Sequence, residues 1–477
     1  MRKLLVGVFL SACLAAAGCG DDSDNGGGEG GTGGSAGAGG DGGSGAEGGS
    51  GGTGGVIPKD CDNLPDTTAY SVPNAPATSS DDCDVTLDAT GTEDQVQIIT
   101  AITEAQTGDV ICLNPGMYDV AATLDITATP ELTLKGIGGS PDDVVLDFKE
   151  RGSKGIFVSV DDVTIENMWV KNTAENAVEQ RGTTGSVFRK LHVSWDAGSI
   201  TENGAYCIYP TDCFDTVIEF NQVSGASDAG LYVGKCEGGT VNNNWVHANV
   251  AGVEVENSLD VDVFDNEIFD NTGGLLALQE PIPGGRLTNT NVFMFDNGVF
   301  CNNRSNFALP GSTVAELPQG TGAMSFGGAG VEIFDNVIDG NVSVGMIIVS
   351  NVLLCQLSGQ DCDFDEIPGY NPYPEQIYIH DNTYVANGED PQSILADISI
   401  VTGVPMPTII WDGYVRPGVT DPQICLGTEE LPTYYDLTQN MCQDAESVEA
   451  CIIMNASPDA TGRSCAVDLP IEDPEPI

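Results

Sequence analysis

Two glutamates spaced two residues apart are the groups best placed for chemistry in this sequence. Glu254 and Glu256 stand in GVEVENS at 252–258. An extended strand would point both side chains to one face, with their β-carbons roughly 6–7 Å apart. Asp228 precedes Tyr232 by four residues in the neighbouring segment GASDAGLYVG. Such carboxylates can serve as general acid and base, or together hold Ca²⁺. Asp228, Glu254 and Glu256 are therefore candidate catalytic residues and a candidate Ca²⁺ site.

Tyrosines and a few charged residues occupy matching positions in neighbouring segments. Aligned on a repeated Asn, one set lies twelve residues before it: Glu179, Tyr209, Tyr232 and Glu254. A second set lies two residues later: Arg181, Thr211, Gly234 and Glu256. Each set should form a column on the solvent side of successive strands.

We interpret several of these side chains as substrate-binding residues, because an exposed tyrosine ring offers an apolar face to a sugar ring. The set is Glu179, Arg181, Tyr209 and Tyr232, with Glu202 and Asn203 from an inserted loop. Lys235 is one of the few nearby cations and a candidate base. A simpler interpretation is that alternating strands expose polar residues without any function. The histidines His192, His247 and His380 fall at different offsets in their repeats and are interpreted as surface residues.

A repeated pattern predicts the elements that position these residues. Each copy of the pattern alternates apolar residues, then has an inward Asn, and ends with a second Asn at a bend. Copies are VDVFDNEIFDN at 261–271, VEIFDNVIDGN at 331–341 and IYIHDNTYVAN at 377–387. The inward Asn recurs at Asn221, Asn244, Asn266, Asn297, Asn336 and Asn382, after Met168 and Leu191 in the same slot. Alternation indicates strands, and a repeat of about 22–23 residues indicates stacked coils. The fold class expected is all-β: a single-stranded right-handed parallel β-helix, with the Asn residues forming a structural ladder.

Other segments should close the two ends of this solenoid. Thr92 and Gln95 form a capping box for an amphipathic helix that would cover the first coil. The β-helix is expected over 92–395, after an N-terminal extension at 57–91. The Cys- and Pro-rich region 396–477 is expected to be a disulfide-stapled cap or tail.

The N-terminus predicts export and a lipid anchor. Arg2 and Lys3 precede an apolar stretch that closes with Ala-Ala-Gly-Cys at 16–19, so 1–18 resembles a lipoprotein signal peptide and Cys19 the lipidated residue. An ordinary cleaved signal peptide is the alternative. Residues 19–56 form a Gly-rich tether with a reach of roughly 30–36 Å. The protein is expected in the cell envelope, anchored by lipid alone and at the outer membrane, as a monomer.

Net charge and cysteine content restrict the classes of partner and predict disulfides. The formal net charge of −55 excludes nucleic acid, because no basic surface is available to contact phosphates. Fifteen cysteines in an exported chain indicate disulfides. Cys213 and Cys236 each precede a ladder Asn by eight residues, which predicts a disulfide between adjacent coils. Cys355 with Cys362, and Cys451 with Cys465, are further candidate pairs.

Four segments resemble a known group: TENGAYCIYP at 201–210, GASDAGLYVG at 225–234, NVAGVEVENS at 249–258 and YPEQIYIHDNTYVANGEDP at 373–391. They are similar to the secreted or lipid-anchored bacterial β-helix repeat proteins of the pectin-lyase-like superfamily. The resemblance covers 92–395 and WDG at 411–413. It implies a polysaccharide ligand, or another exported envelope protein as partner. The Asp-Pro-His-Asp motif of alginate epimerases and the polygalacturonase signatures are absent, so no catalytic residue carries over. Cys207 also stands where the next coils have Gly230 and Gly252.

Two functions are therefore expected. One is polysaccharide processing, including a Ca²⁺-assisted uronate lyase or epimerase reaction at the carboxylates. The other is a non-catalytic carbohydrate-binding or adhesion module.

Overall fold

The computed structural model describes residues 59–281, 289–358, 364, 367–403, 405–428, 431–437, 457–458, 460–467 and 469. The signal peptide, Cys19 and the Gly-rich tether lie outside these residues. The described residues belong to one compact unit. Within the described part of the chain, no helix combines the length and apolar character that a membrane span requires.

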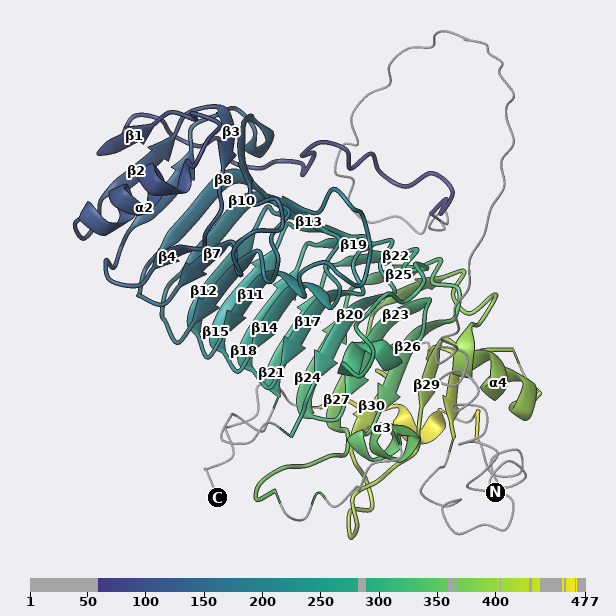
Figure 1. The fold of residues 1–477 in the computed structure, drawn as a ribbon. Coiled ribbons are helices and arrows are strands. Elements are labelled where there is room, and N and C mark those ends of the chain that lie inside the picture. The colour runs from purple at the N-terminus through teal and green to yellow at the C-terminus, as the bar shows by residue number, and fades with distance from the viewer. Residues whose placement is uncertain are drawn as a thin grey trace, which may run out of the picture. The chain divides into compact units, whose positions relative to one another are not determined.

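The fold is the expected right-handed parallel β-helix, built from parallel strands that stack coil on coil (Figure 1). One long face, sheet B, holds one strand from each coil. Its described strands are β4 Leu124–Ile126, β7 Ile156–Val158, β9 Val178–Arg181, β11 Tyr206–Thr211, β14 Ala229–Gly234, β17 Ala251–Glu256, β20 Gly273–Leu278, β23 Thr321–Phe326, β26 Val344–Val349, β29 Ile409–Trp411 and β31 Tyr434–Asp436.

The remaining strands form sheet A, which bends around the other sides of each coil. They are β1 Val85–Leu87, β2 Val110–Leu113, β3 Gly116–Asp119, β5 Thr133–Gly136, β6 Val144–Asp147, β8 Thr164–Lys171, β10 Val187–Ser194, β12 Phe214–Glu219, β13 Gln222–Ser224, β15 Glu237–Asn242, β16 Trp245–His247, β18 Leu259–Phe264, β19 Glu267–Phe269, β21 Thr290–Phe295, β22 Gly298–Phe300, β24 Ala329–Phe334, β25 Val337–Asp339, β27 Glu375–His380, β28 Thr383–Val385 and β30 Ile424–Cys425.

The predicted Asn ladder forms the bend within sheet A. Asn244 Nδ2 donates to Asn266 Oδ1 at 2.9 Å, and Asn266 Nδ2 donates to Asn297 Oδ1 at 2.9 Å. The residue before each Asn adopts a positive φ, as at Asp265 (54°) and Asp296 (53°). Asp and Asn tolerate this left-handed conformation better than other side chains, which explains the recurrent Asp-Asn pair. The second Asn of each repeat forms a parallel ladder, as where Asn249 Nδ2 donates to Asn271 Oδ1 at 3.1 Å.

Apolar side chains from both sheets fill the interior, and a column of small residues runs beside the second ladder. A β-carbon on Gly230 would lie 2.6 Å from Asn249 Nδ2, and one on Gly252 would lie 2.5 Å from the Gly274 carbonyl oxygen. A side chain at either of these two positions would require its neighbours to shift, which accounts for the glycines there. Cys207 occupies this column in an earlier coil, where it is buried and unpaired.

The first coil differs in detail from the prediction. The expected helix is α2, Gln95–Glu104, but the predicted capping box of Thr92 and Gln95 is wrong. Asp94 is the residue before the helix, and its carboxylate accepts hydrogen bonds from Thr90 and from the Gly91 amide instead. Strand β1 lies before α2 and pairs with β2, so the paired strands already begin in the N-terminal extension.

The paired strands also continue beyond residue 395, where the sequence repeat ends. β29 pairs with β26, β31 pairs with β29, and β30 pairs with β27. Their sequences lack the Asn pair, so the repeat pattern does not reveal them. The other described helices are α3 Asn351–Ser358, α4 Ser393–Thr402 and the short η1 Pro141–Asp143, η2 Thr313–Glu316 and η4 Thr461–Arg463.

An extended segment, Lys59–Cys83, runs along the outside of the coils and is called the strap. It begins beside β25, where the Lys59 amide donates to Asp339 Oδ2 at 2.7 Å. Midway, the Tyr70 hydroxyl donates to the Phe220 carbonyl at 2.6 Å. It ends at the first coil, where Cys83 is bonded to Cys112. The strap therefore passes the coils in the order opposite to their order along the chain (Figure 1).

Disulfides fasten coils, strap and tail. The predicted Cys213–Cys236 bond is confirmed, with 4.4 Å between the α-carbons. Cys61 is bonded to Cys301, which attaches the strap to the coil of β22. The predicted Cys451–Cys465 pair is wrong, because Cys465 is bonded to Cys425. Cys355 is disulfide-bonded, and its predicted partner Cys362 lies outside the described residues.

Candidate functional site

The outer face of sheet B brings together the residues singled out by register. Tyr209 pairs with Glu179, and Tyr232 pairs with Glu254. Glu256 lies beside Gly234 on the neighbouring strand. The predicted columns are therefore present on β9, β11, β14 and β17. They continue as apolar residues on the next strand, where Glu254 pairs with Leu276 and Glu256 with Leu278.

The carboxylate–tyrosine cluster comprises Asp228, Glu254, Glu256, Glu280, Tyr206, Tyr209 and Tyr232. Its three tyrosine rings stack on one another, with centroids 4.3 Å apart for Tyr206–Tyr209 and 4.7 Å apart for Tyr209–Tyr232. The Tyr232 hydroxyl donates to Glu256 Oε2 at 3.1 Å. Tyr206 hydrogen-bonds to the Asp228 side chain. Aromatic rings thus form one wall of the cluster and also provide its hydrogen-bond donors.

Burial keeps the carboxyls of this cluster protonated to unusually high pH. It raises the pKa of Asp228 to about 7, against a hydrogen bond from Tyr206 that lowers the value. It raises the pKa of Glu256 to about 8, and the charge of Glu280 adds to the rise. Burial also raises the pKa of Glu254 well above its ordinary value, with further contributions from Asp228 and Glu256. Mutual repulsion of this kind allows neighbouring acids to differ in protonation at one pH.

The expectation that these columns face solvent is wrong for most of their members, although Arg181 is exposed and Tyr209 is half-buried. Glu179 is 1% exposed, Tyr232 and Glu254 are 3% exposed, and Glu256 is 7% exposed. A long insertion packs over the apolar part of this face: residues 304–319, the covering segment. Leu317 lies over Gly273 and belongs to the same buried cluster as Tyr232 and Leu276. Alternation identifies the outward face of a strand, but it does not reveal what packs against that face.

Hydrogen bonds hold the covering segment in one conformation. Asn306 Nδ2 donates to the carbonyls of Val314 and Leu317 at 2.9 and 3.0 Å. Thr313 hydrogen-bonds to Glu280, which joins the segment to the cluster. Tyr206, Tyr209 and Asp228 are only half-buried, so they form the part of the cluster open to solvent.

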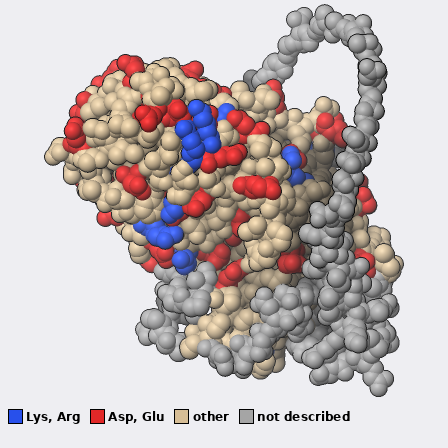
Figure 2. Space-filling model, viewed as in Figure 1, with Lys and Arg blue, Asp and Glu red and all other residues tan. Residues whose placement is uncertain are grey.

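The predicted basic residues bind other partners. Lys154 and Arg181 contact Glu179 Oε1 at 2.6 and 3.1 Å, so Glu179 belongs to an ion-pair network at the edge of the column. Lys235 lies in a turn and contacts Asp212 Oδ2 at 3.2 Å. Within the described residues, no ion pair joins a basic side chain to Asp228, Glu254 or Glu256. Figure 2 shows acidic side chains spread over the visible face and basic ones confined to a few patches.

The inserted loop residues lie outside the cluster. Glu202 is exposed on the loop between β10 and β11. Asn203 Nδ2 donates to the carbonyls of Gly198 and Gly225 at 2.5 and 2.6 Å, which holds the loop in place. Asn203 therefore has a structural partner for its amide, and the two residues contribute no side chain to the carboxylates.

The candidate Ca²⁺ residues do not form a ligand set. No group of three or more His, Cys, Asp or Glu side chains in the described part of the chain is arranged to hold a metal ion. Glu254 Oε2 is buried and lacks a hydrogen-bond partner. A protonated carboxyl is also a poor ligand for a hard cation, since the ligand form is the carboxylate.

Two members of the cluster were not identified from the sequence. Tyr206 lies three residues before Tyr209 in AYCIYP, and Glu280 follows Leu278 by two residues. The same period-two count would place Glu280 after Leu276 and Leu278 on the outward face.

The histidine prediction is wrong for two of the three residues. His192 is buried, stacks on Trp169 at 4.3 Å and contacts Asp142 Oδ1 at 2.7 Å. His247 is buried against Phe269 at 5.3 Å between ring centroids, and burial lowers its pKa to about 3. Both help to cover the outside of sheet A.

Comparisons with known proteins agree with the fold. The family model for a right-handed β-helix region matches residues 145–280, which include the whole carboxylate–tyrosine cluster. No curated protein sequence matches.

Solved structures are similar only in fold. The catalytic unit of an α-1,3-glucanase from Streptomyces thermodiastaticus aligns over 75% of this chain and 54% of its own, at 15% identity and a TM-score of 0.42. An alginate lyase from Paenibacillus sp. aligns over 53% of this chain and 94% of its own, at 14% identity and a TM-score of 0.33. A pectate lyase, Pel9A, aligns over 53% and 62%, at 16% identity and a TM-score of 0.31. The chain thus spans about half the length of the glucanase unit.

Proposed function

We propose that this chain, a right-handed parallel β-helix protein, hydrolyses a neutral polysaccharide at its carboxylate–tyrosine cluster. One observation carries the proposal. Asp228, just before β14, lies with Glu254 and Glu256 of β17 beside stacked tyrosines. Burial raises the pKa of Asp228 to about 7, that of Glu256 to about 8 and that of Glu254 well above its ordinary value. Perturbed carboxyls gathered at one place are a recognised sign of acid–base chemistry.

The chemistry follows from the order of the pKa values. Glycoside hydrolysis needs one carboxylic acid and one carboxylate. The group with the higher pKa, Glu256, would donate its proton to the glycosidic oxygen as the bond from that oxygen to the anomeric carbon breaks. Asp228 has the lower pKa and would accept a proton from the water that attacks this carbon. One water is consumed, and each product gains a hydroxyl group.

The tyrosines support a sugar ligand. Tyr206 and Tyr209 are half-buried and border the carboxyls. Their rings can pack against the apolar face of a pyranose, while the neighbouring carboxyls bond its hydroxyls. Neutral sugars fit better than uronates, because the cluster contains four acids and no described basic side chain bonded to Asp228, Glu254 or Glu256.

These features favour hydrolysis over the Ca²⁺-assisted elimination expected from the sequence. Elimination from a uronate requires a cation to neutralise the sugar carboxylate, and Lys235 already contacts Asp212. We expect EDTA to leave turnover unchanged. Loss of activity on metal removal, with unsaturated uronate products that absorb in the ultraviolet, would instead support elimination.

Substitution of the acids tests the proposal. Purified protein is incubated with neutral glucans, galactans and mannans, and with pectate and alginate, while new reducing ends are measured. Glu256→Gln and Asp228→Asn should each lower turnover by about 10²–10⁴-fold. Glu202→Gln is the matched control, because its carboxyl is exposed outside the cluster. Equal rates in all variants, or no product from any neutral polymer, would reject catalysis at this cluster.

The near-complete burial of Glu254 favours a second candidate, a non-catalytic carbohydrate-binding module. In that case only the tyrosines would contact the ligand. Tyr209→Ala would then weaken glycan binding, Glu256→Gln would not, and no polymer would be cleaved.

We also propose export and attachment to the cell envelope through a lipid on Cys19, from the signal pattern at 1–19. Cys19→Ala should abolish incorporation of radiolabelled palmitate and release the protein from the membrane fraction. Unchanged palmitate labelling would reject Cys19 as the lipidation site.

A further inference from the structure

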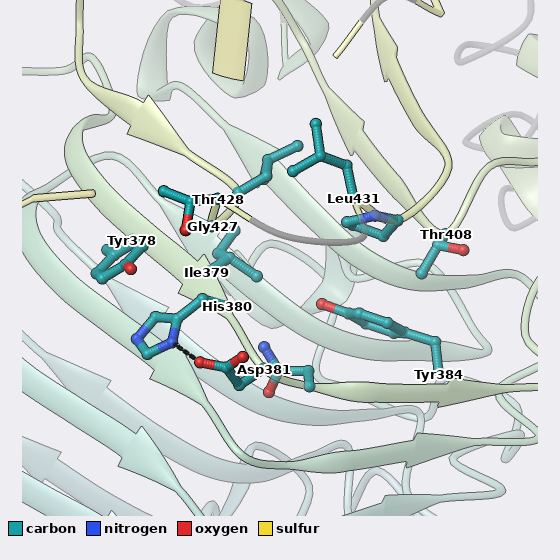
Figure 3. Close-up of a pocket in the computed structure, with 12 residues that line it drawn as sticks. Tyr378, Ile379, His380, Asp381, Tyr384, Thr408, Gly427, Thr428 and Leu431 are labelled. Atoms are coloured by element: carbon teal, nitrogen blue, oxygen red, sulfur yellow. Dashed lines mark hydrogen bonds and ion pairs between the residues drawn. The ribbon is translucent and has the colours of Figure 1, made fainter. Parts of the chain in front are cut away.

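A cavity lies beside strands β27 and β28 of sheet A, near the C-terminal end of the β-helix. It has a volume of about 600 Å³. Strands β27 and β28 form one side, and residues 426–428 with Leu431 and Pro432 form the other (Figure 3). The lining residues include Tyr378, His380, Asp381, Tyr384, Thr408 and Thr428. A volume in this range is typical of small-molecule sites in proteins.

His380 is held rigidly at the edge of this cavity. Its Nδ1 contacts Asp381 Oδ2 at 2.6 Å, and its Nε2 contacts Glu332 Oε1 at 2.8 Å. Each ring nitrogen of His380 therefore has a carboxylate partner. The ring also stacks on Tyr378 at 4.0 Å and on Phe334 at 5.2 Å. Since neither nitrogen is free, His380 is suited to shaping a binding site rather than to acting as a base.

Aromatic rings and hydroxyl groups line the cavity on both sides of His380 and Asp381. In Figure 3, Tyr378 and Thr428 lie on one side of His380 and Asp381, and Tyr384 and Thr408 lie on the other. Ile379, Leu426 and Leu431 add apolar surface. Aromatic faces next to hydroxyl and carboxylate groups match a ring that is apolar on its faces and polar at its edge.

The charge of the surroundings excludes an anionic ligand. Glu332 and Asp381 border His380. Burial and the charges of Asp296 and Asp381 raise the pKa of nearby Asp335. Negative groups therefore outnumber positive ones. The carboxylates that contact His380 are already paired with it, so a ligand need not bring a positive charge.

We propose that this cavity binds a neutral sugar unit, as a glycan subsite separate from the carboxylate–tyrosine cluster. The proposal extends the proposed carbohydrate function to sheet A, but it does not require cleavage at sheet B. The ring of the sugar packs against Tyr378 or Tyr384, and its hydroxyls bond Asp381 and Thr428.

Calorimetry with the folded chain tests this site. The probes are maltohexaose, laminarihexaose and cellohexaose as neutral chains, hexagalacturonate as an anion and a glucosamine hexamer as a cation. Tyr378→Ala and Asp381→Asn remove the proposed contacts. Asp381 has a φ of 51°, and Asn tolerates this conformation, so the second variant should fold. Tyr209→Ala, in the other site, is the matched control, and thermal unfolding checks each variant.

The expected result is that at least one neutral hexasaccharide binds wild type, and that both cavity variants weaken this binding by about tenfold or more. Tyr209→Ala and Glu256→Gln should retain this cavity binding, even if they abolish cleavage. Three results would each overturn the proposal. They are the absence of binding of any neutral probe at about 1 mM, an affinity equal to that of wild type in both Asp381→Asn and Tyr378→Ala, and binding confined to hexagalacturonate or to the glucosamine hexamer. Absence of cleavage together with intact binding in the cavity would reject the proposed hydrolysis but not this sugar subsite, so the two proposals can fail separately.

Discussion

Glu256 illustrates how this structure keeps an acid protonated near neutral pH. Its carboxyl lies among tyrosine rings and accepts one hydrogen bond, from Tyr232. Burial and the charge of Glu280 together raise its pKa to about 8. The same cause raises the pKa of Asp228 to about 7. An exposed carboxyl with an ordinary pKa of about 4 would be fully ionised at these pH values.

These pKa values predict that stability falls as pH rises from about 5 to about 8.5. The unfolded chain has already lost these carboxyl protons in that window, whereas the folded chain still binds them. Raising the pH therefore removes protons that only the folded state holds. Urea unfolding at several pH values measures the effect.

Glu256→Gln should flatten this dependence and raise stability near pH 8 by on the order of 1–3 kcal/mol. Glu202→Gln should behave like wild type, because that carboxyl is exposed. A free energy of unfolding that did not change across the window would contradict the protonated cluster.

The hydrogen bond from Tyr232 gives a second prediction. A donor to the ionised carboxyl lowers its pKa, so Tyr232→Phe should raise the pKa of Glu256 above that in wild type. Carboxyl ¹³C chemical shifts followed over pH would report the change. Tyr209→Phe is the control, because Tyr209 stacks on Tyr232, whereas the hydrogen bond to Glu256 comes from Tyr232. A pKa of Glu256 that moved equally in both variants would show that ring packing, rather than the hydroxyl, sets it.

Register predicted which of these residues share a column, but not how they are buried. Tyr209 does pair with Glu179, and Tyr232 with Glu254, because the strand period is fixed at two. Residues 304–319, which pack over the apolar part of this face, have an irregular sequence with no period. The same limit explains the buried His192 and His247.

At the scale of the element, the Asn ladder determines where each coil bends. Asn266 accepts from the Asn244 amide at 3.0 Å and donates to the carbonyls of Val241 and Phe264, both at 2.9 Å. Leu191 fills the same slot at the start of the ladder, where its backbone amide donates to Asn221 Oδ1 at 2.8 Å. An apolar residue is thus tolerated at the end of the ladder but leaves buried groups unpaired within it.

Substitution within the ladder should therefore cost more stability than substitution at its end. Asn266→Leu leaves several buried backbone groups without partners and should destabilise the fold by about 3 kcal/mol or more. Asn382→Leu is the matched control, because Asn382 is half-buried and is the last member. Chemical unfolding of both variants measures the difference. Similar losses at the two positions would show that side-chain volume, rather than hydrogen bonding, dominates.

Element boundaries were harder to predict than element types. The coils were recognisable from the Asp-Asn pair, since positive φ and an inward amide restrict the residues allowed there. Strands β29, β30 and β31 lack this pair and were assigned to the tail. The helix α2 was found from its apolar period, although Asp94 rather than Thr92 makes the polar contacts at its start.

At the scale of the whole unit, the strap joins coils that are far apart in the sequence. It contacts β25 at Asp339, the Phe220–Gln222 turn in the middle and Lys135 near the first coil. The side-chain amide of Gln222 hydrogen-bonds to the strap twice: it donates to the Thr67 carbonyl and accepts from the Ser71 amide. The N-terminal extension carried no signal for this path, because an extended strap has neither a helical nor a β-helix period.

Removing the disulfide at the start of the strap should loosen it locally. A Cys61→Ser, Cys301→Ser variant should show faster amide hydrogen exchange at residues 59–71 and a loss of about 2–4 kcal/mol in unfolding free energy. The Cys213→Ser, Cys236→Ser variant is the control, because that bond joins adjacent coils and should leave exchange in the strap unchanged. Equal exchange in the strap of both variants would show that its hydrogen bonds suffice.

The Cys61–Cys301 bond also decides how the unit would respond to tension. A pull on the chain upstream of Lys59 reaches Cys61 first and passes through the covalent bond to Cys301. The force therefore enters the β-helix at the coil of β22 and does not peel β1 from β2. The strap beyond Cys61 and the earlier coils bear no load. These coils include β17, which carries Glu254 and Glu256, and β14, which Asp228 directly precedes. Mechanical stress on the N-terminal side is in this way diverted from the strands that hold the carboxylates.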